Sequence, residues 1–537
     1  MKKNIFMKKT FSLFISAVML ISTASCGKKD EGNVTLEWWY RGNGMQADTM
    51  LVQDKLNEML KNYDGMENVT VHLNCATASD YQTQVTLAMS GGKQIDILNT
   101  VNLSFDDMCK DGYLLPLDEF IDSSNSLKDT LPDWLWELGK YEDKTYMIPN
   151  YQNAAARPYM IFPKAYTEAF PKFENMKTIL KNENSTVSEV AGILEEYLLA
   201  VRAAYPDEEK YLNPIGRFYA MSNVLSPVHD SFSWGYAYYP KTNSAENMLT
   251  TDWAKEAFKY TAEWYEKGYI HPDILTKTIT DFEQQNMMNP TSFVYSTNSG
   301  FLGEEEYSKT LSESYGFEVV AVALRDTFYQ GYTWASGGNC VTVTCKHPDK
   351  AMRLIELMNT EEGKELYNLM VYGIEGKHYE KIDDNHIKTF EYDTTQGGVS
   401  TSYAAMKWII GNSYNAYINQ GGSEELDKLS KEINESDKLV KSPLMGFHSN
   451  TDNIKSNLDQ LSAIVTEYSN TLSFGIMGSK WEEKYNEYEE KIKLAAVFYI
   501  HQNFFILLCK KSCIQIFNLF SCDFISIHWS KPPIRYP

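Results

Sequence analysis

The stretch Val-Thr-Leu-Glu-Trp-Trp-Tyr at residues 34–40 is where the sequence first predicts a folded domain. Its β-branched and aromatic residues are typical of a strand. Apolar stretches at 69–73 and 95–99 follow, and each is preceded by residues with a helical period. The order strand–helix–strand–helix–strand predicts a parallel sheet with right-handed crossovers. We therefore expect an α/β fold.

The carboxyl ends of these strands form the first candidate binding region. In open α/β sheets, ligands lie beyond the carboxyl ends of the strands. Tyr40 and Arg41 end the strand at 34–40, and Asn99 ends the strand at 95–99. Neighbouring strand residues alternate between faces, so one of the aromatics at 38–40 must face the core. We favour Tyr40, Arg41 and Asn99 as residues that face a binding cleft.

The composition indicates a large chain with sizeable cores. The chain has 537 residues, which suits two large folding units, and 43% of them are hydrophobic. The formal net charge is −21, which argues against partners such as nucleic acid and against electrostatic docking on anionic lipid. The 36 Tyr, 25 Phe and 11 Trp can build cores, and they also supply the stacking surfaces that binding sites need.

The N-terminus has the pattern of a secretory signal. Lysines precede an apolar stretch at 11–21 and small residues at 22–25, which predicts a signal peptide at 1–25. Cys26 resembles the lipidated cysteine of a bacterial lipobox, although Thr23 stands where that pattern usually has Leu. We expect residues 26–33 to be a lipidated cysteine and linker that anchor the chain to the outer face of the cell membrane. The alternative is a plain secreted protein in which Cys26 occurs by chance.

The remainder of the chain divides into three regions. Residues 150–315 predict further α/β structure, and residues 360–494 predict mostly helix. The composition changes abruptly after Ala496, because residues 497–537 contain a single acid and three of the eight cysteines. We interpret 497–537 as an aberrant or disordered tail that arose by frameshift or read-through. The alternative is a tail that associates with a membrane or a partner.

Six short motifs occur in an order that is informative as a set. They are GGKQIDI at 91–97, DGYLLPL at 111–117, YEDKTYMIP at 141–149, WYEKGYIHPD at 264–273, HPDKA at 347–351 and YGIEGKHY at 372–379. Together with Cys26, they resemble the extracellular solute-binding lipoproteins of bacterial ABC importers, of the carbohydrate type. The resemblance extends from about residue 34 to about residue 493.

This resemblance implies a periplasmic-binding-protein-like fold with two α/β lobes, hinge strands and an interlobe cleft that closes around a solute. One lobe would comprise 33–150 with 316–360. The other would comprise 151–315 with 361–495, with the C-terminal part mostly helical. The implied partners are a carbohydrate ligand, in particular an oligosaccharide, and the ABC permease subunits. We expect the protein to be a monomer.

A sugar offers apolar C–H faces and a ring of hydroxyls. Its site should therefore combine aromatic side chains with amides, carboxylates or arginine. Aromatic–polar clusters near strand ends and lobe crossings supply the further candidate ligand-binding residues, which are Tyr151, Asn153, Trp234, Asn298, Trp334 and Trp408. For each of them the alternative is core packing or lobe–lobe contact.

Catalytic patterns are missing from the sequence. It contains no Gly-x-Ser-x-Gly, no His-Glu-x-x-His and no phosphate loop, and its nine histidines lack metal-ligand spacing. Adjacent acids such as Asp106-Asp107 cannot straddle a glycosidic bond. We expect no catalytic residue, no metal and no cofactor. A surface glycoside-processing enzyme and an envelope adhesin or structural lipoprotein are the alternative functions.

Overall fold

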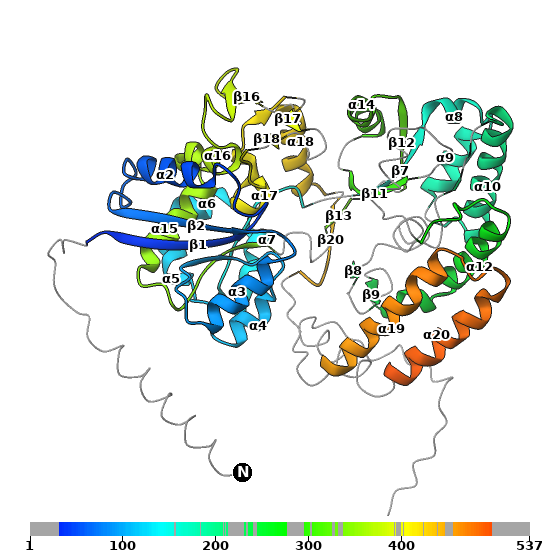
Figure 1. Ribbon diagram of the computed structural model, residues 1–537, viewed down its shortest axis with the longest axis horizontal. Helices are drawn as coiled ribbons and strands as arrows, with labels where there is room; N and C mark the ends of the chain where they lie inside the picture. Colours follow the sequence, from blue (N-terminus) through cyan, green and yellow to red (C-terminus); the bar gives the residue numbers. More distant parts are fainter. Residues whose placement is uncertain are drawn as a thin grey trace, which may run out of the picture.

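The structure is a computed structural model. It describes residues 32–496, with gaps at 155–156, 183, 208, 210, 213–229, 232–234, 240–243, 276–294, 301–302, 325–327, 331–336, 391, 394–398, 401, 421, 423, 438 and 446–454. The expected signal peptide, Cys26 and the tail lie outside the described residues, and so do Trp234 and Trp334. Figure 1 shows two bodies side by side, which we call the first lobe and the second lobe.

The first lobe is built on a five-stranded sheet. Its strands are β1 (Val34–Arg41), β2 (Val69–Ala76), β3 (Ile97–Asn99), β6 (Ile148–Pro149) and β14 (Gly338–Val341). The strand order is β2-β1-β3-β14-β6, and β1 pairs in parallel with both β2 and β3. β14 arrives from a distant part of the chain and pairs antiparallel with β3 and β6. The predicted parallel strand–helix units are confirmed.

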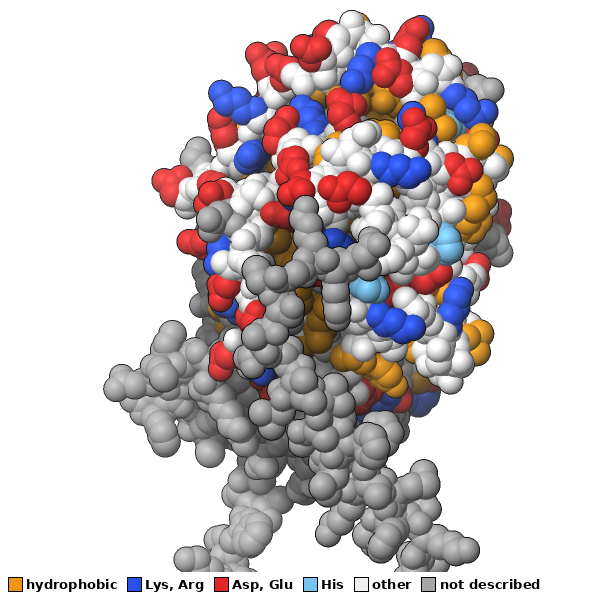
Figure 2. All heavy atoms as spheres, turned by 90° about the vertical axis from the view of Figure 1, so that its left-hand side faces the viewer, with side chains coloured by type: hydrophobic (Ala, Val, Ile, Leu, Met, Phe, Trp, Pro, Cys, Tyr) orange, Lys and Arg blue, Asp and Glu red, His pale blue; other side chains and the backbone are white. Residues whose placement is uncertain are grey.

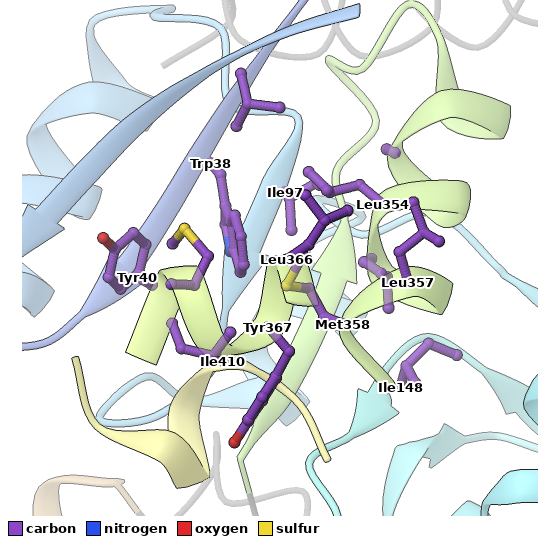
Figure 3. Packing of buried hydrophobic residues seen from close by; sticks show 14 of the residues in the cluster. Trp38, Tyr40, Ile97, Ile148, Leu354, Leu357, Met358, Leu366, Tyr367 and Ile410 are labelled. Carbon is purple, nitrogen blue, oxygen red and sulfur yellow. The ribbon is translucent and has the colours of Figure 1, made fainter. Parts of the chain in front are cut away.

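Helices cover both faces of this sheet (Figure 1). On one face lie α2 (Thr49–Leu60), α15 (Pro348–Asn359) and α16 (Lys364–Tyr372), and on the other lie α3 (Tyr81–Ser90) and α4 (Phe105–Lys110). Trp38 and Tyr40 pack into the core on the first face (Figure 3), whereas Trp39 packs into the core on the second. β1 is therefore buried on both faces, as the central strands of parallel sheets are.

Shorter elements complete the first lobe. The helices among them are α5 (Asp118–Ser123), α6 (Asn125–Thr130), α7 (Asp133–Trp136), η1 (Glu137–Gly139), η3 (Glu361–Gly363), α17 (Lys407–Ile410) and η5 (Ser413–Asn415). The strands are β4 (Lys140–Tyr141), β5 (Lys144–Thr145), β15 (Tyr379–Lys381), β16 (His386–Thr389), β17 (Tyr392–Asp393), β18 (Val399–Ser400) and β19 (Ile418–Asn419).

The second lobe has its own sheets and its own cores. Its strands are β7 (Arg157–Pro163), β8 (Asp230–Ser231), β9 (Tyr236–Tyr239), β10 (Ser244–Asn247), β11 (Tyr295–Gly300) and β12 (Val319–Ala323). Its helices are α8 (Lys164–Glu168), α9 (Phe173–Lys181), α10 (Val187–Ala204), η2 (Met248–Thr250), α12 (Asp252–Glu266), α14 (Glu304–Tyr315), α19 (Lys455–Ser473), η7 (Gly478–Lys480) and α20 (Trp481–Ala496). β7 lies between β11 and β12, antiparallel to both.

Local sequence signals set the long helices of this lobe. α10 begins with a capping box, in which the Thr186 hydroxyl accepts from the amide of Glu189 and the Glu189 carboxylate accepts from the amide of Thr186. The buried side chains of α10 and α12 form one core with the inner face of β7. α19 and α20 pair and pack on α12 through a separate core. The expected helices are therefore present at 455–496, whereas residues 379–419 contain the short strands β15 to β19.

The assignment of segments to lobes differs from our expected division. We placed 316–360 in the first lobe, but β12 pairs with β7 of the second, with Val320 opposite Phe162. We placed 361–495 in the second lobe, but α16 packs against α2, and Ile409 and Ile410 belong to the core of the first lobe. The position of β12 depends on its pairing with the edge of β7, and the position of α16 depends on the apolar face that it packs against the first lobe. The order of segments along the chain reveals neither contact.

Three elements lie between the two lobes (Figure 1). They are β13 (Phe328–Gln330), α18 (Glu424–Asn434) and β20 (Leu439–Lys441). β13 pairs in parallel with β20, and Phe328, Ile433 and Leu439 form a small core there. The chain therefore passes between the lobes near residue 154, after β12 and around α18. We call these three elements the hinge elements.

The surface of the first lobe carries mixed charge. Figure 2 looks onto this lobe and shows acidic and basic side chains interspersed over the described residues of that face. Several charged side chains of the first lobe form exposed pairs, such as Lys55–Glu58 and Lys128–Asp122. Exposed pairs of this kind contribute little to stability. The stability of this lobe therefore rests on the cores on the two sides of its sheet.

We predict that two glycine-to-alanine changes have opposite effects on stability. A Cβ on Gly338 would lie 2.4 Å from the backbone oxygen of Ile148 in the neighbouring strand, so Gly338→Ala should lower the free energy of unfolding. The expected loss is about 1–3 kcal/mol, as for overpacking. Gly192 is exposed within α10, and beyond the backbone of its own helix a Cβ there would meet no described heavy atom within 4 Å. Gly192→Ala should therefore raise stability by about 0.5–1 kcal/mol. Denaturant unfolding measures both changes, and a neutral Gly338→Ala would contradict the prediction.

Candidate functional site

Three buried asparagines hold one loop across the strand ends of the first lobe. Asn99 ends β3, Asn150 follows β6, and Asn339 lies in β14. Each is at most 1% exposed, and we call the three side chains the asparagine cluster. Their amide groups all donate to backbone oxygens of residues 408–410. This segment therefore lies against the ends of three neighbouring strands.

The bonds of the cluster leave little freedom in its geometry. Asn150 Nδ2 donates to the oxygens of Trp408 at 3.0 Å and Ile409 at 2.9 Å. Asn99 Nδ2 donates to the oxygen of Ile409 at 3.1 Å, and Asn339 Nδ2 donates to that of Ile410 at 3.2 Å. These oxygens belong to α17, a single turn whose last carbonyls have no partner within the helix. The asparagine amides supply the missing donors.

The cluster is also bonded internally and to the core. Asn339 Nδ2 donates to Asn150 Oδ1 at 3.3 Å, and Trp38 Nε1 donates to Asn339 Oδ1 at 3.2 Å. The loop approaches α15 closely, because a Cβ on Gly411 would lie 2.3 Å from the oxygen of Met358. Only glycine fits at such a distance from backbone. The loop after α17 is thus fixed from two sides.

This arrangement brings together two residues that the sequence suggested separately. The guanidinium carbon of Arg41, at the end of β1, lies 5.3 Å from the centroid of the Trp408 ring. Both side chains are half-buried, and Arg41 Nε is buried with no hydrogen-bond partner among the described residues. A guanidinium stacked on an indole face keeps donors available in its own plane. The pair therefore places a half-buried indole and a guanidinium whose Nε has no hydrogen-bond partner among the described residues at the carboxyl end of β1.

The loop between β1 and α2 follows Arg41 directly, and hydrogen bonds hold it in place. Gln46 Nε2 donates to the oxygen of Ala404 at 2.7 Å, and the amide of Ala404 donates to Gln46 Oε1 at 3.1 Å. At the end of the loop, the Asp48 carboxylate is hydrogen-bonded to His378 Nε2 at 3.1 Å and forms an ion pair with Lys377 Nζ at 3.2 Å. These contacts link the start of α2 to the YGIEGKHY motif. Residues of that motif therefore hold the end of the loop in place.

The hydrogen bonds around Asp48 determine the charge of its carboxylate. His378 is fully buried, and its Nδ1 accepts from the amide of Ile374 at 2.8 Å, so the ring hydrogen is on Nε2. Desolvation acts to raise the pKa of Asp48, but the hydrogen bonds from His378 and Lys377 outweigh it and hold that pKa below its usual value. The Asp48 carboxylate is therefore charged at neutral pH.

Tyr40 and Asn99 lie elsewhere than expected for residues open to a solute. Tyr40 is 1% exposed, packs 5.4 Å from the Trp38 ring centroid, and has a pKa that burial raises well above its usual value. Both faces of β1 are covered, so its side chains are buried whichever face of the sheet they point to. Asn99 is fully buried in the asparagine cluster. Both side chains support the site from within the lobe.

Tyr151 and Asn153 lie where the chain leaves the first lobe. Tyr151 is 2% exposed, with the rings of Trp134 at 6.2 Å and Tyr414 at 4.9 Å. Burial raises the pKa of Tyr151 to about 12. Asn153 is half-buried two residues further along. Tyr151 is thus a buried member of an aromatic group at the hinge.

The remaining candidates are placed less fully. Asn298 lies in β11 of the second lobe, and its side chain is outside the described residues, as are Trp234 and Trp334 entirely. Sequence reasoning did not single out Asn150 or Asn339 as structural residues. A signal existed, because Asn99 and Asn150 each follow an apolar strand, and a buried strand end needs polar partners.

Comparison with known proteins defines the class first. The N-glycan transport solute-binding protein from Streptococcus pneumoniae has a crystal structure that matches with a TM-score of 0.67 at 19% identity, covering 89% of this chain and 100% of that one. The same protein has also been solved with Man5GlcNAc, with a TM-score of 0.58. An extracellular solute-binding protein from Bifidobacterium longum subsp. infantis matches with a TM-score of 0.61 at 14% identity, covering 90% and 99%. The fold is that of two-lobed solute-binding proteins, which confirms the expected fold class.

Sequence comparison then gives the family. The family described as bacterial extracellular solute-binding protein matches residues 58–374, and a domain of unknown function matches residues 443–498. A carbohydrate ABC transporter substrate-binding protein of Streptococcus pneumoniae serotype 4 is 25% identical over 420 residues, covering 75% of this chain and 78% of the relative. The chain belongs to the family of bacterial extracellular solute-binding proteins. Within the described ranges, no helix has both the length and the apolar character that crossing a membrane requires.

We predict that Asp48→Asn makes folding less sensitive to acid. The folded-state pKa of Asp48 lies below its unfolded value, so its contribution to stability is present above about pH 4 and is lost as the pH falls through the folded pKa. The wild type should therefore lose more free energy of unfolding than Asp48→Asn when the pH falls from about 5 to about 3. Urea unfolding at several pH values measures the difference. Asp54→Asn changes an exposed position on the same helix and serves as the control, and equal slopes for wild type and Asp48→Asn would rule the effect out.

Proposed function

We propose that this protein captures an oligosaccharide outside the cell and delivers it to the permease subunits of an ABC importer. The observation that carries the proposal is the Arg41–Trp408 pair at the carboxyl end of β1. An indole face suits the apolar face of a sugar, and guanidinium donors suit its hydroxyls. The carbohydrate transport named for the relatives supports the same solute class.

The site performs this role by binding alone. The asparagine cluster holds the backbone that carries Trp408, and Gln46 holds the loop that follows Arg41. A site held in place before the solute arrives loses less entropy on binding. Closure of the second lobe toward this surface would enclose the sugar, and the sugar would be released unchanged.

We predict that Trp408→Ala weakens oligosaccharide binding by about 10-fold or more while the protein stays folded, because stacking contacts of this kind dominate binding energy. Wild-type protein is screened by thermal shift against Man5GlcNAc and a panel of other oligosaccharides, because a bound solute raises the unfolding temperature by mass action. Calorimetric titration of the best solute then compares wild type, Trp408→Ala and Trp481→Ala. Trp481 starts α20 in the second lobe and serves as the control.

Two results would oppose this proposal. One is a panel in which no oligosaccharide raises the unfolding temperature, and the other is a Trp408→Ala variant that binds as the wild type does. Chromatography of the sugar after incubation tests the alternative of a glycoside-processing enzyme. We expect the sugar to be recovered intact.

We also propose that Cys26 is lipidated after removal of residues 1–25 and tethers the protein to the outer face of the cell membrane. The pattern of lysines, apolar residues and small residues before Cys26 supports the proposal. More than one acyl chain is needed for stable anchoring, and a lipoprotein cysteine carries several. Residues 27–33 would then serve as a polar linker.

We predict that Cys26→Ala moves the protein from the membrane fraction to the soluble fraction. Without the thiol, no thioether to the lipid can form. Fractionation of expressing bacterial cells and immunoblotting measure the distribution. Ser25→Ala keeps a small residue before Cys26 and should leave the protein on the membrane. A Cys26→Ala protein that still sediments with membranes would refute the anchor.

A further inference from the structure

The hinge helix α18 contacts both lobes with different side chains. Leu426 and Leu429 pack against the core of the second lobe that contains Tyr159 and Tyr307. At the other end of the helix, the side chains of Ser430 and Asn434 are hydrogen-bonded to residues of the first lobe and its exit segment. A helix in this position is attached to the second lobe by apolar contacts and to the first by polar ones.

Asn434 makes three hydrogen bonds from a fully buried position. Its Nδ2 donates to the oxygen of Gln152 at 2.9 Å and to the hydroxyl of Tyr414 at 3.2 Å. Its Oδ1 accepts from the amide of Ala154 at 2.9 Å. One side chain thus joins α18, the segment that leaves the first lobe, and the loop that follows α17.

Tyr414 continues this connection toward the candidate site. Because its hydroxyl accepts from Asn434, the hydroxyl hydrogen is free to bond Ser430 Oγ, which lies 3.0 Å away. Its ring packs edge-on against Tyr151, and the amide of the preceding residue, Ser413, donates to the oxygen of Tyr151 at 2.7 Å. Earlier in the same loop stands Trp408, which the asparagine cluster fixes to the strand ends.

We propose that Tyr414 and Asn434 couple the two lobes, so that the lobes unfold as one cooperative unit. A buried polar side chain that loses its partner costs more free energy than an exposed one, because water cannot replace the bond. Motion of α18 away from the first lobe would break the bonds of Asn434 and Tyr414 together. These two residues are positioning residues, and the coupling does not depend on which solute is bound.

The second lobe contains a matched pair that serves as the control. The Tyr488 hydroxyl donates to Asn247 Oδ1 at 3.0 Å, and both residues are buried within that lobe. Tyr488→Phe and Asn247→Ala therefore remove a buried Tyr–Asn bond that does not connect the lobes. Tyr414→Phe and Asn434→Ala remove the bonds that do. Tyr414→Phe keeps the ring against Tyr151, so the fold of the loop is retained.

Differential scanning calorimetry of the full chain without solute distinguishes coupling from simple stabilisation. The wild type should show one transition whose van't Hoff and calorimetric enthalpies agree. Tyr414→Phe should make the van't Hoff and calorimetric enthalpies diverge, and Asn434→Ala should divide the transition into two. Tyr488→Phe and Asn247→Ala should lower the unfolding temperature and keep a single transition.

Each other outcome overturns the proposal. A wild type that already unfolds in two transitions shows that α18 does not couple the lobes. Single transitions in both Tyr414→Phe and Asn434→Ala, shifted like the controls, show a purely local structural role. If Asn434→Ala does not fold, Tyr414→Phe and Ser430→Ala decide. Tyr414→Phe removes both bonds of the hydroxyl, Ser430→Ala removes only the bond to Ser430 Oγ, and both variants keep the side chain of Asn434.

Discussion

A buried amide must find hydrogen-bond partners, and the asparagine cluster meets that requirement by holding residues 408–410 across the strand ends of the first lobe. The donors come from three strands or strand ends that are far apart in the chain. The acceptors are the last carbonyls of a single helical turn, which cannot be satisfied within that turn. The asparagine amides and the carbonyls of α17 therefore satisfy each other's need for a hydrogen-bond partner.

This constraint sets the position of Trp408 and so of the Arg41–Trp408 pair. Arg41 ends β1 in the same sheet, and the loop that follows it is fixed by Gln46 and Asp48. Hydrogen-bonded residues on both sides therefore hold the Arg41–Trp408 pair in place. On the hinge side, Tyr414 and Asn434 extend the same hydrogen-bonded framework to α18.

The sequence predicted the α/β class, the strand–helix units at 34–99 and the family, because periodicity and short motifs are local properties. It did not predict that β12 joins β7 or that α16 joins α2, because these contacts depend on edges and faces that meet only in three dimensions. For the site, Arg41 and Trp408 were both singled out, yet their contact was not foreseeable from positions so distant in the chain. Tyr40 was singled out because it ends a strand, but a strand covered on both faces buries its residues whichever way they point.

The placement of β14 has a consequence for biosynthesis. β14 separates β3 from β6, so the sheet has an open edge at β3 until residue 341 has been made. The side-chain amides of Asn99 and Asn150 lack their hydrogen-bond acceptors for longer still, until residues 408–410 have been synthesised. An unpaired strand edge attracts other chains. A nascent chain of this topology therefore exposes the edge of β3 and these side-chain amides until most of the chain has been synthesised.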